Sequence, residues 1–371
     1  MVARDAASEP RPGGRGGILL YGMYDISVLN GAPKVRIAMM TEALSARAHT
    51  ERIVGGRFAR ARVAARWFVS GGPGRVRGVY VESATTSAMP TDLLFLLLMR
   101  LRRKRVGVYF RDAYQLYRDI YPRRRRRQIL SDWLWRLTTP MLARIATHRF
   151  AASHGLAAAL GLRDAIVLGP GADTTMPDLG AGEQPLVAYV GSNDRADGFE
   201  ILLAAMAIVH ERFPEARLRM IGPGLPPERR AELPPYVELR PSARDGLAGL
   251  LADARVCVIP RPINPYSNLA MPIKLWDYLS LGKPVVATAA TETAGILAAS
   301  GAGIATPDTP EGLAGGLLQV LADAGLARRL AANARTFAMS TEATWDARAL
   351  TVLRTLDVAE AAGPGPSRAN G

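Results

Sequence analysis

Short apolar runs alternate with longer amphipathic segments along almost the whole of this 371-residue chain. Runs such as 18–23 and 186–190 have the length and composition of buried strands, whereas 33–48 and 199–211 have the period of helices that cover a sheet. Regular alternation of this kind predicts parallel sheets with helices on both faces. The chain is long enough for two such domains. We expect strands at 18–23, 78–81, 106–110, 148–152, 165–168, 186–190, 218–221, 237–239, 255–259, 284–287 and 303–305.

A segment rich in glycine, proline and aspartate interrupts this alternation after residue 168. We place the domain junction there, with an N-terminal domain at 18–170, a linker at 171–184 and a C-terminal domain at 185–340. The ends, 1–17 and 358–371, are rich in Gly, Pro and charge and are expected to be disordered tails. Two doubly wound, Rossmann-like domains would face each other across a cleft, with ligands at the carboxyl ends of the strands.

Positive charge is concentrated in the N-terminal half. The net charge is +14, but residues 1–180 carry 29 Lys and Arg against 13 Asp and Glu, whereas residues 181–371 carry 18 against 20. Such a surface attracts nucleic acid or an anionic membrane. The apolar run 93–99 and Trp133 adjoin the basic clusters and favour a membrane, although arginines on solvated helix faces would give the same composition. The candidate membrane or acceptor residues are Arg102, Arg103, Lys104, Arg105, Arg123, Arg124, Arg125, Arg126, Arg127 and Trp133.

Several function classes are excluded by what the sequence lacks. A single cysteine, Cys257, permits no intrachain disulfide and no cysteine-based metal site. No apolar run approaches the ~20 residues of a membrane-spanning helix. The dinucleotide and P-loop glycine motifs are missing, as is any D-x-D metal clamp, so neither a dehydrogenase nor a P-loop kinase is favoured. We expect a cytoplasmic protein, peripheral on the inner face of the plasma membrane, without a metal.

The stretch PIKLWDYLSLGKPVVAT at 272–288 is the most informative in the chain. Pro272 opens a predicted helix, and Gly282 ends it before an apolar strand. Lys274 and Asp277 are three residues apart and therefore share one helix face. A cation near a helix N-terminus can hold a diphosphate, and a carboxylate one turn later can accept hydrogen bonds from ribose hydroxyls. A surface ion pair on a capped helix would have the same spacing.

This stretch resembles the nucleotide-sugar motif of GT-B glycosyltransferases, in the family-4-like branch (glycosyltransferase group 1), where P-x-K-L-x-E-Y-x-x-x-G-K-P-V-V recurs. The similarity implies the GT-B fold, with the acceptor bound by the N-terminal domain and the nucleotide sugar by the C-terminal domain. It also implies a closing helix, 341–357, that returns towards the N-terminal domain. Further similar segments cover most of the C-terminal half, at 188–192, 198–209, 217–224, 246–260 and 344–356.

Similarity in the N-terminal half is limited to shorter segments. NGAPKVR at 30–36 is similar to the family's first glycine loop, which implies that Gly31 approaches the donor. VYFRDAYQLYRDIYP at 108–122 is similar to its D-x-x-D-x-x-P segment. Asp112 follows an expected strand, where a doubly wound sheet places catalytic groups. We predict that Asp112 orients or deprotonates the acceptor hydroxyl, with a helix cap or an ion pair to Arg111 as the alternative.

One acidic position of the family pattern is lost. The branch carries two acidic residues eight positions apart, and with Asp277 as the second, the first position is occupied by Leu269. Ser267 and Asn268 are the neighbouring polar side chains, and we expect them to meet sugar hydroxyls instead. This substitution argues against a mechanism that needs both carboxylates.

The basic pair that holds the donor phosphates in the family is also incomplete. It follows the glycine of the first C-terminal strand, which corresponds to Gly191. Arg195 is present, but the second basic position reads Asp197-Gly198. Arg261 is the candidate to compensate for the missing charge.

The resemblance therefore implies a hexosyltransferase-type, metal-independent enzyme that moves a sugar from a nucleotide-diphosphate sugar to an acceptor hydroxyl. The basic, apolar-flanked N-terminal half suggests that this acceptor is a lipid-linked saccharide or glycolipid of cell-surface polysaccharide synthesis. The expected partners are the nucleotide sugar, the acceptor and an anionic membrane surface, with no nucleic acid and no cofactor. A nucleotide-sugar epimerase or hydrolase on the same fold, and a noncatalytic membrane-surface partner, are the alternatives.

Overall fold

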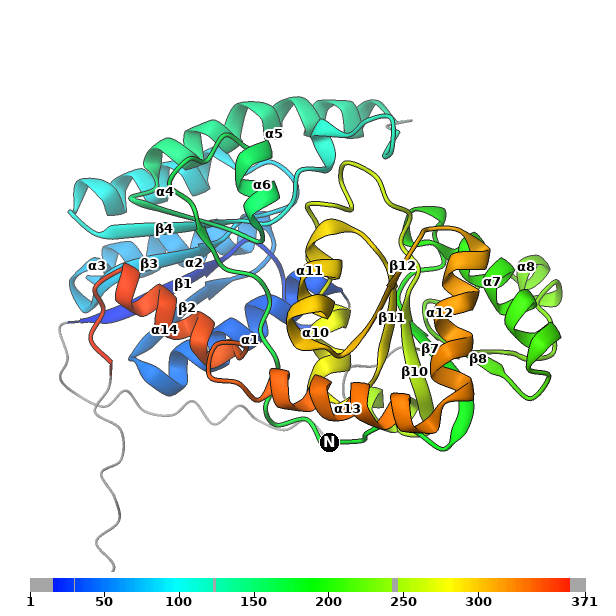
Figure 1. Ribbon diagram of the computed structural model, residues 1–371. Helices are drawn as coiled ribbons and strands as arrows, with labels where there is room; N and C mark the ends of the chain where they lie inside the picture. The colour runs from blue at the N-terminus through cyan, green and yellow to red at the C-terminus, as the bar shows by residue number, and fades with distance from the viewer. Residues whose placement is uncertain (1–15, 30, 123–124, 242–245, 361–371) are drawn as a thin grey trace, which may run out of the picture.

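The computed structural model describes residues 16–29, 31–122, 125–241 and 246–360, and it has two α/β domains (Figure 1). Each domain is built on a six-stranded sheet, and all neighbouring strands of both sheets are parallel. The expected fold class, two doubly wound Rossmann-like domains, is confirmed. Most of both expected tails lies outside the described residues; Gly17 opens the first strand, and Val358 is buried.

The N-terminal sheet has the strand order β2-β1-β3-β4-β5-β6, and the C-terminal sheet has the order β12-β11-β10-β7-β8-β9. The strands are β1 Gly17–Gly22, β2 Thr50–Val54, β3 Val76–Glu82, β4 Arg105–Phe110, β5 His148–Ala151, β6 Ile166–Val167, β7 Gln184–Val190, β8 Arg217–Gly222, β9 Val237–Pro241, β10 Ala254–Ile259, β11 Val285–Thr288 and β12 Gly303–Thr306.

Helices cover both faces of each sheet (Figure 1). They are α1 Ala32–Arg47, α2 Arg57–Val69, α3 Gly72–Arg75, α4 Pro90–Leu101, α5 Arg126–Ile145, α6 His154–Ala159, α7 Phe199–Arg212, α8 Pro227–Ala231, α9 Leu247–Leu251, α10 Ile273–Ser280, α11 Thr291–Ser300, α12 Pro310–Ala322, α13 Ala324–Ala338 and α14 Trp345–Thr355. Short 3₁₀ turns lie at Tyr114–Leu116 and Arg195–Asp197.

Strand β1 illustrates how the sequence divides its side chains between two cores. Ile18 and Leu20 point to the core shared with α1 and α14, whereas Leu19 and Tyr21 point to the core shared with α2 and α4. Successive side chains of a strand point to opposite faces, so a strand buried on both sides is apolar throughout. This pattern explains why a continuous apolar run correctly predicted the strand.

The chain crosses between the domains twice, and the two crossings lie side by side. Ala172 of the linker accepts a hydrogen bond from the backbone N–H of Trp345 (3.2 Å), and its own N–H donates to the carbonyl of Ala343 (2.8 Å). Gly171 is required here, because a Cβ at this position would collide with the backbone of residues 344–345. Helix α14 then packs on α1 beneath the N-terminal sheet (Figure 1).

The sequence did not predict strand β2 or helix α2. Strand β2 has the sequence TERIV and lies at the edge of the sheet, where it pairs only with β1. An edge strand is half-buried and tolerates charged residues, so it lacks the apolar run that identifies the central strands. Helix α2 carries four arginines among its 13 residues and buries only Arg60 and Ala64, which obscures its apolar face.

We predict that replacing Leu356 with alanine destabilises the N-terminal domain by about 2–5 kcal/mol, the cost of a large-to-small change in a closed core. Leu356 is fully buried and packs where Gly78 of β3 and Gly107 of β4 leave room for it. Thermal unfolding measures the change. Leu101→Ala, at a position that is 70% exposed, is the matched control and should change stability by no more than about 0.5 kcal/mol. Equal effects of the two substitutions would contradict this account of α14.

Candidate functional site

A cleft of about 290 Å³ lies between the two domains. The N-terminal domain contributes the first turn of α1, with Ala32 and Pro33, and residues that follow β4. The C-terminal domain contributes Arg261, which follows β10, and the loop that leads into α10. Both walls are therefore made at the carboxyl ends of parallel strands, where doubly wound sheets bind ligands.

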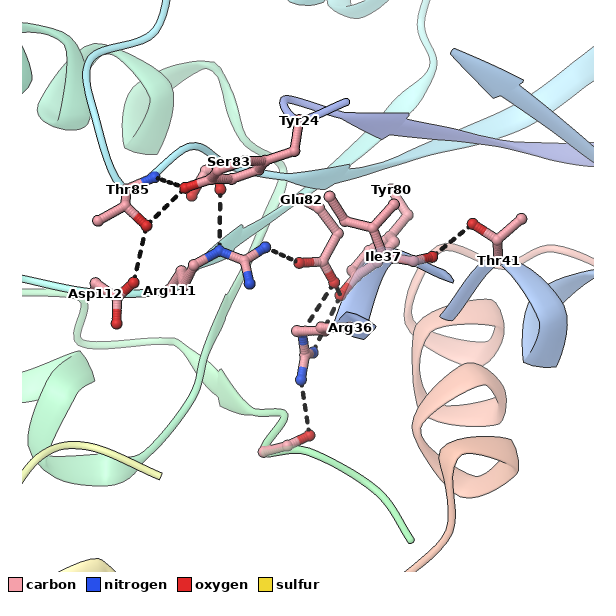
Figure 2. A network of polar contacts seen from close by, with 11 residues as sticks. Tyr24, Arg36, Ile37, Thr41, Tyr80, Glu82, Ser83, Thr85, Arg111 and Asp112 are labelled. Carbon is pink, nitrogen blue, oxygen red and sulfur yellow. Dashed lines mark hydrogen bonds and ion pairs between the residues drawn. The ribbon is translucent and has the colours of Figure 1, made fainter. Parts of the chain in front are cut away.

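A buried ionic network forms the N-terminal wall (Figure 2). Arg36 of α1 donates from Nε to Glu82 at the end of β3 (3.0 Å), and Arg111, which follows β4, donates to the other oxygen of Glu82 (2.7 Å). Tyr80 donates to Glu82 (2.7 Å), and Arg36 donates to the carbonyl of Gly169, shortly before the linker (3.0 Å). One carboxylate is thus shared by two guanidinium groups, and both arginines line the cleft.

Aromatic rings complete the surroundings of these buried cations. The guanidinium of Arg36 lies 3.6 Å from the ring centroid of Tyr109, and that of Arg111 lies 5.4 Å from the ring of Tyr24. Such contacts stabilise a cation that has lost its water. Arg36 is only 1% exposed and Glu82 is 0% exposed, so breaking this pair would leave an uncompensated buried charge.

Asp112, the predicted catalytic residue, lines the cleft next to this network (Figure 2). Thr85 donates a hydrogen bond to its Oδ2 (2.9 Å), and the hydroxyl of Tyr266, from the other domain, donates to its Oδ1 (3.1 Å). Burial raises the pKa of Asp112 above its ordinary value, against the opposing effects of Arg111 and these two hydrogen bonds. Each carboxylate oxygen keeps a second acceptor position for a ligand.

Tyr266 joins the two domains through a cluster of aromatic rings. Its ring stacks on Tyr114 with 4.6 Å between centroids, and it meets the rings of Tyr117 and Tyr121 edge-on at 5.8 and 5.1 Å. Aromatic pairs at these distances are favourable beyond the area that they bury. Because Tyr266 also bonds to Asp112, the approach of the two domains positions this carboxylate.

Lys274 lies on the C-terminal wall in the first turn of α10. Its ammonium nitrogen is 4.6 Å from the ring centroid of Tyr189 at the end of β7. Gly191 follows this strand, and a Cβ there would collide with both Lys274 and Tyr189, so only glycine fits. Burial lowers the pKa of Lys274 to about 8, while the carboxylate of Asp197 limits the shift.

Asp197 holds a second cation at the same edge. Its carboxylate accepts a hydrogen bond from Arg261 (2.7 Å) and one from the hydroxyl of Ser192. Burial disfavours the charge of Asp197, but Arg261 and Lys274 outweigh this effect and hold its pKa below the ordinary value. Lys274 and Arg261 are thus two cations beside one anion, Asp197. Asp197 stands where the family has a basic residue, and it orients Arg261, the residue that we expect to compensate for that missing charge.

The remaining predicted donor residues have different surroundings. Gly31 caps α1, whose first turn lines the cleft, whereas Arg195 is exposed and its side chain forms no hydrogen bond or ion pair with another described residue. The hydroxyl of Ser267 bonds to the backbone of residue 264, and the amide oxygen of Asn268 accepts from the N-terminus of α11. Asp277 lies one turn after Lys274 on α10 and is half-buried.

Leu269 occupies the position of the missing acidic residue and lines the cleft. Its side chain packs against the N-terminal core, and its carbonyl accepts a hydrogen bond from the hydroxyl of Ser153 (2.7 Å). A carboxylate at this position would meet the same apolar neighbours. Leu269 therefore contributes to the contact between the domains, and it offers no charge to a ligand.

The predicted membrane and acceptor residues do not form one cluster. Arg102, Arg103, Lys104 and Arg105 lie where α4 ends and β4 begins, at the amino edge of the N-terminal sheet. Lys104 donates to the carbonyl of Val76, and Arg105 pairs with Asp357. The second group begins α5, at the opposite, carboxyl edge: Arg125, Arg126 and Arg127 are exposed there, Trp133 is 59% exposed, and Arg123 and Arg124 lie outside the described residues.

Sequence reasoning missed most of the N-terminal wall. Arg36 was within the segment NGAPKVR, but nothing in that segment distinguishes a buried arginine from an exposed one. Glu82 carried a usable signal, since it is a charged residue directly after the apolar run 78–81. Tyr266 had none, because its partners Tyr114 and Tyr121 are about 150 residues away and meet it only when the domains come together.

Among the residues that the structure describes, no three His, Cys, Asp or Glu side chains are grouped as metal ligands would be. In the same part of the chain, every helix is too short or too polar to cross a bilayer.

Comparison with known proteins relates both domains to glycosyltransferases. A family model described as "Glycosyl transferases group 1" matches residues 184–323. The sucrose-phosphate synthase of Thermosynechococcus elongatus has a similar structure, with a TM-score of 0.68, 17% identity and coverage of 92% of this chain and 98% of that one. Anabaena HepE, in complex with UDP and glucose, gives a TM-score of 0.63, 16% identity and coverage of 92% and 99%.

WaaG, a glycosyltransferase involved in lipopolysaccharide biosynthesis, has a TM-score of 0.62 and 14% identity, with coverage of 90% of this chain and 99% of that one. No curated protein matches the sequence. The family match runs from β7 to α12 and includes Lys274 and Asp277, and the solved structures share the arrangement of both domains. The expected fold is confirmed: this chain has the two-domain GT-B architecture of these solved structures, and residues 184–323, which make up most of its C-terminal domain, match the group 1 glycosyltransferases.

Proposed function

We propose that this enzyme transfers a glycosyl group from a nucleoside-diphosphate sugar to an acceptor hydroxyl in the cleft between its domains. The proposal depends chiefly on Lys274, a half-buried cation in the first turn of α10. Its lowered pKa means that a positive charge is held there at a cost in solvation, which a bound anion would relieve. A nucleoside diphosphate is an anion of suitable charge for such a site.

Departure of the diphosphate requires that its developing negative charge be stabilised. Lys274 and Arg261 supply two cations at the C-terminal wall, and Asp197 fixes the direction of Arg261. The N-terminus of α1, which has no acidic residue in its first turn, supplies partial positive charge from the opposite wall. Asp277, one turn after Lys274, would accept hydrogen bonds from the ribose hydroxyls.

The acceptor hydroxyl would be held at the N-terminal wall, next to Asp112. Burial raises the pKa of this carboxyl and so strengthens it as a base. Thr85 and Tyr266 fix the orientation of the carboxylate through one hydrogen bond to each oxygen. We assign Asp112 the role of orienting the acceptor hydroxyl and accepting its proton as the glycosidic bond forms.

We further propose that the acceptor is presented at an anionic membrane surface, as a lipid-linked saccharide or glycolipid. Helices α4 and α5 lie next to each other (Figure 1). Both expose apolar side chains, which together we call the apolar stripe. Its members are Leu94, Leu97, Leu101, Ile129, Leu130, Trp133, Leu137 and Met141. Arginines stand at the end of α4 and at the beginning of α5, so basic groups flank the stripe at both ends. Exposed Leu and Trp beside Arg suit the interface of an anionic bilayer.

Two similar proteins support the choice of substrates. Anabaena HepE was solved in complex with UDP-glucose, and WaaG is involved in lipopolysaccharide biosynthesis. A nucleotide-sugar donor and a cell-surface glycolipid acceptor are therefore the first classes to test on this chain.

Leu269 favours one alternative, a noncatalytic partner that keeps the fold, because it removes a carboxylate from the family pattern. Calorimetry with a panel of nucleotide sugars, followed by an assay for nucleotide release, separates the possibilities. Acceptor-dependent release supports a transferase, and release without any acceptor supports a hydrolase or epimerase. Binding without release supports the noncatalytic partner.

We predict that Lys274→Ala weakens nucleoside-diphosphate binding by ~1.5–3 kcal/mol, since it removes a charge-assisted hydrogen bond from a buried site. Isothermal titration measures the affinity. Lys104→Ala is the matched control, because Lys104 is also half-buried, has a lowered pKa and bonds to Val76 far from the cleft. Unchanged donor affinity in both Lys274→Ala and Asp277→Ala would contradict the donor site.

The pKa of Lys274 predicts how donor binding depends on pH. Protonated Lys274 binds phosphate, so affinity should be highest below pH 8 and fall as pH rises through the pKa of about 8. The loss should approach about tenfold per pH unit until affinity reaches that of Lys274→Ala. Lys274→Arg should remove this dependence, since arginine stays charged. A flat wild-type profile between pH 7 and pH 9.5 would rule out the charged lysine as the ligand.

Transfer should proceed without a divalent ion, because the proposed phosphate ligands are cationic side chains and a helix N-terminus. A chelator should change the initial rate by no more than about twofold. Activity that is abolished by EDTA and restored by Mg²⁺ or Mn²⁺ would refute this prediction.

Membrane attachment should depend on both charge and the apolar stripe. We expect the protein to sediment with phosphatidylglycerol vesicles at low salt and to be released at high salt, because a ~8 Å screening length weakens Arg–lipid attraction. Trp133→Ser, or Arg125→Ser with Arg126→Ser, should reduce pelleting. Val69→Ser is the control, because it alters an exposed apolar residue of α2 outside the stripe, and it should leave pelleting unchanged. Equal pelleting with neutral and anionic vesicles would contradict attachment to an anionic membrane and would favour a soluble acceptor.

A further inference from the structure

A second cavity, which we call the side pocket, lies within the N-terminal domain and has a volume of about 610 Å³. It shares two wall residues, Thr85 and Tyr114, with the cleft. Thr85 also bonds to Asp112 (2.9 Å), so the side pocket opens beside the carboxylate that we assign to the acceptor. A molecule that fills the pocket and reaches past Thr85 would bring its next hydroxyl to Asp112.

The side pocket is bordered by two arginines at the beginnings of two helices. Arg57 is the first residue of α2, and Arg127 lies in the first turn of α5. Neither guanidinium forms a hydrogen bond or ion pair with another described residue. Neither helix has an acidic residue in its first turn, although the N-terminus of a helix favours negative charge. Two helix N-termini and two cations therefore border one cavity, whose lining includes a single carboxylate, that of Asp132.

A buried acceptor atom supplies the second observation. Gln115 lines the side pocket and is only 2% exposed, and its Nε2 donates to the carbonyl of Thr85 (2.7 Å). This hydrogen bond fixes which side of the amide is oxygen. The oxygen, Oε1, has no hydrogen-bond partner among the described residues, which is unfavourable for a buried polar atom. A hydroxyl donor on a ligand would satisfy it.

One carboxylate also lines the pocket. Asp132 is almost fully buried, and Arg118 lies 3.8 Å from it, which offsets its charge. Tyr114 adds an aromatic wall of the kind on which a sugar ring packs. The pocket thus combines two cations with only one carboxylate, a hydrogen-bond acceptor that lacks a donor, and an aromatic side chain.

We propose that the side pocket binds the acceptor through a sugar residue that carries an anionic group, a phosphate or a carboxylate, held by Arg57 and Arg127. A hydroxyl of the same residue donates to Oε1 of Gln115, and the hydroxyl to be glycosylated reaches Asp112. This inference rests on the proposed function for the identity of the ligand as acceptor. The anionic site itself depends only on the geometry of the N-terminal domain.

The test is a ligand-observed NMR titration of the full chain with glucose 6-phosphate, glucuronate and glucose. The wild type should bind glucose 6-phosphate and glucuronate about tenfold or more tightly than glucose. Arg57→Gln with Arg127→Gln should reduce this preference to about twofold or less. The control variant, Arg62→Gln with Arg144→Gln, removes the same amount of charge from exposed positions on α2 and α5. It should retain the preference for anionic sugars over glucose. Thermal unfolding of each variant checks that it is folded.

Gln115→Glu provides an independent variant at nearly constant shape. It places a negative charge in the pocket and should abolish the preference for anionic sugars, whereas neutral glucose should be much less affected. Lys274→Ala should leave the preference intact, because Lys274 belongs to the donor wall.

Two further arms identify the source of the anion. A phosphate gains its second negative charge between pH 5 and pH 7.5. An affinity that increases over this pH range for glucose 6-phosphate, but not for glucuronate, would favour a phosphorylated sugar. Displacement of the sugar by phosphatidylglycerol vesicles, dependent on Arg57 and Arg127, would assign the anion to a lipid headgroup. Both results support an anionic site.

Equal affinity for charged and neutral sugars, or a preference that survives in the double Arg57/Arg127 variant, would overturn the proposal. Titration of the same samples with ADP, CDP, GDP and UDP keeps this outcome distinct from failure of the proposed function. Loss of the sugar preference with intact, Lys274-dependent nucleotide binding refutes only the side pocket. An intact sugar preference without Lys274-dependent nucleotide binding refutes the donor site and supports the anionic side pocket.

Discussion

The ion pair between Arg36 and Glu82 is the interaction on which the cleft depends. It joins α1 to the end of β3, and Arg36 also holds Gly169, shortly before the linker begins. Both groups have lost nearly all contact with water, a cost of several kilocalories per mole for each ion that only close, complete pairing offsets. Arg111 and Tyr80 supply that pairing, so the first turn of α1 is held against the carboxyl edge of the sheet.

The opposite wall follows the same physical rule with weaker burial. Asp197 stands between Arg261 and Lys274, and its charge permits two cations to remain close together at the end of the C-terminal sheet. At the C-terminal wall two cations share one carboxylate, whereas at the N-terminal wall Arg36 and Arg111 are matched by Glu82 and Asp112. The excess positive charge therefore lies at Lys274 and Arg261, which is why we assign the diphosphate to that wall.

Family pattern and tertiary structure disagree most usefully at Leu269 and Asp197. Each replaces a charged residue of the pattern, and each has a role that the pattern does not contain: Leu269 packs the domains together, and Asp197 orients Arg261. Tyr266 links the C-terminal domain to Asp112 through its hydroxyl and to Tyr114 through its ring. The carboxylate proposed as base is therefore held by Thr85 of its own domain and by Tyr266 of the other domain.

The sequence alone determined the central strands, the two domains and the helix and strand of the segment 272–288, because buried parallel strands and capped helices leave local patterns. It missed β2, whose edge position permits TERIV, and it grouped the basic residues of α4 and α5, which the structure separates to opposite edges of the sheet. Only the tertiary structure decided that Arg36 is buried and Arg127 exposed. The reason is physical: the environment of an arginine depends on partners far away in the chain, such as Glu82, and no local pattern records them.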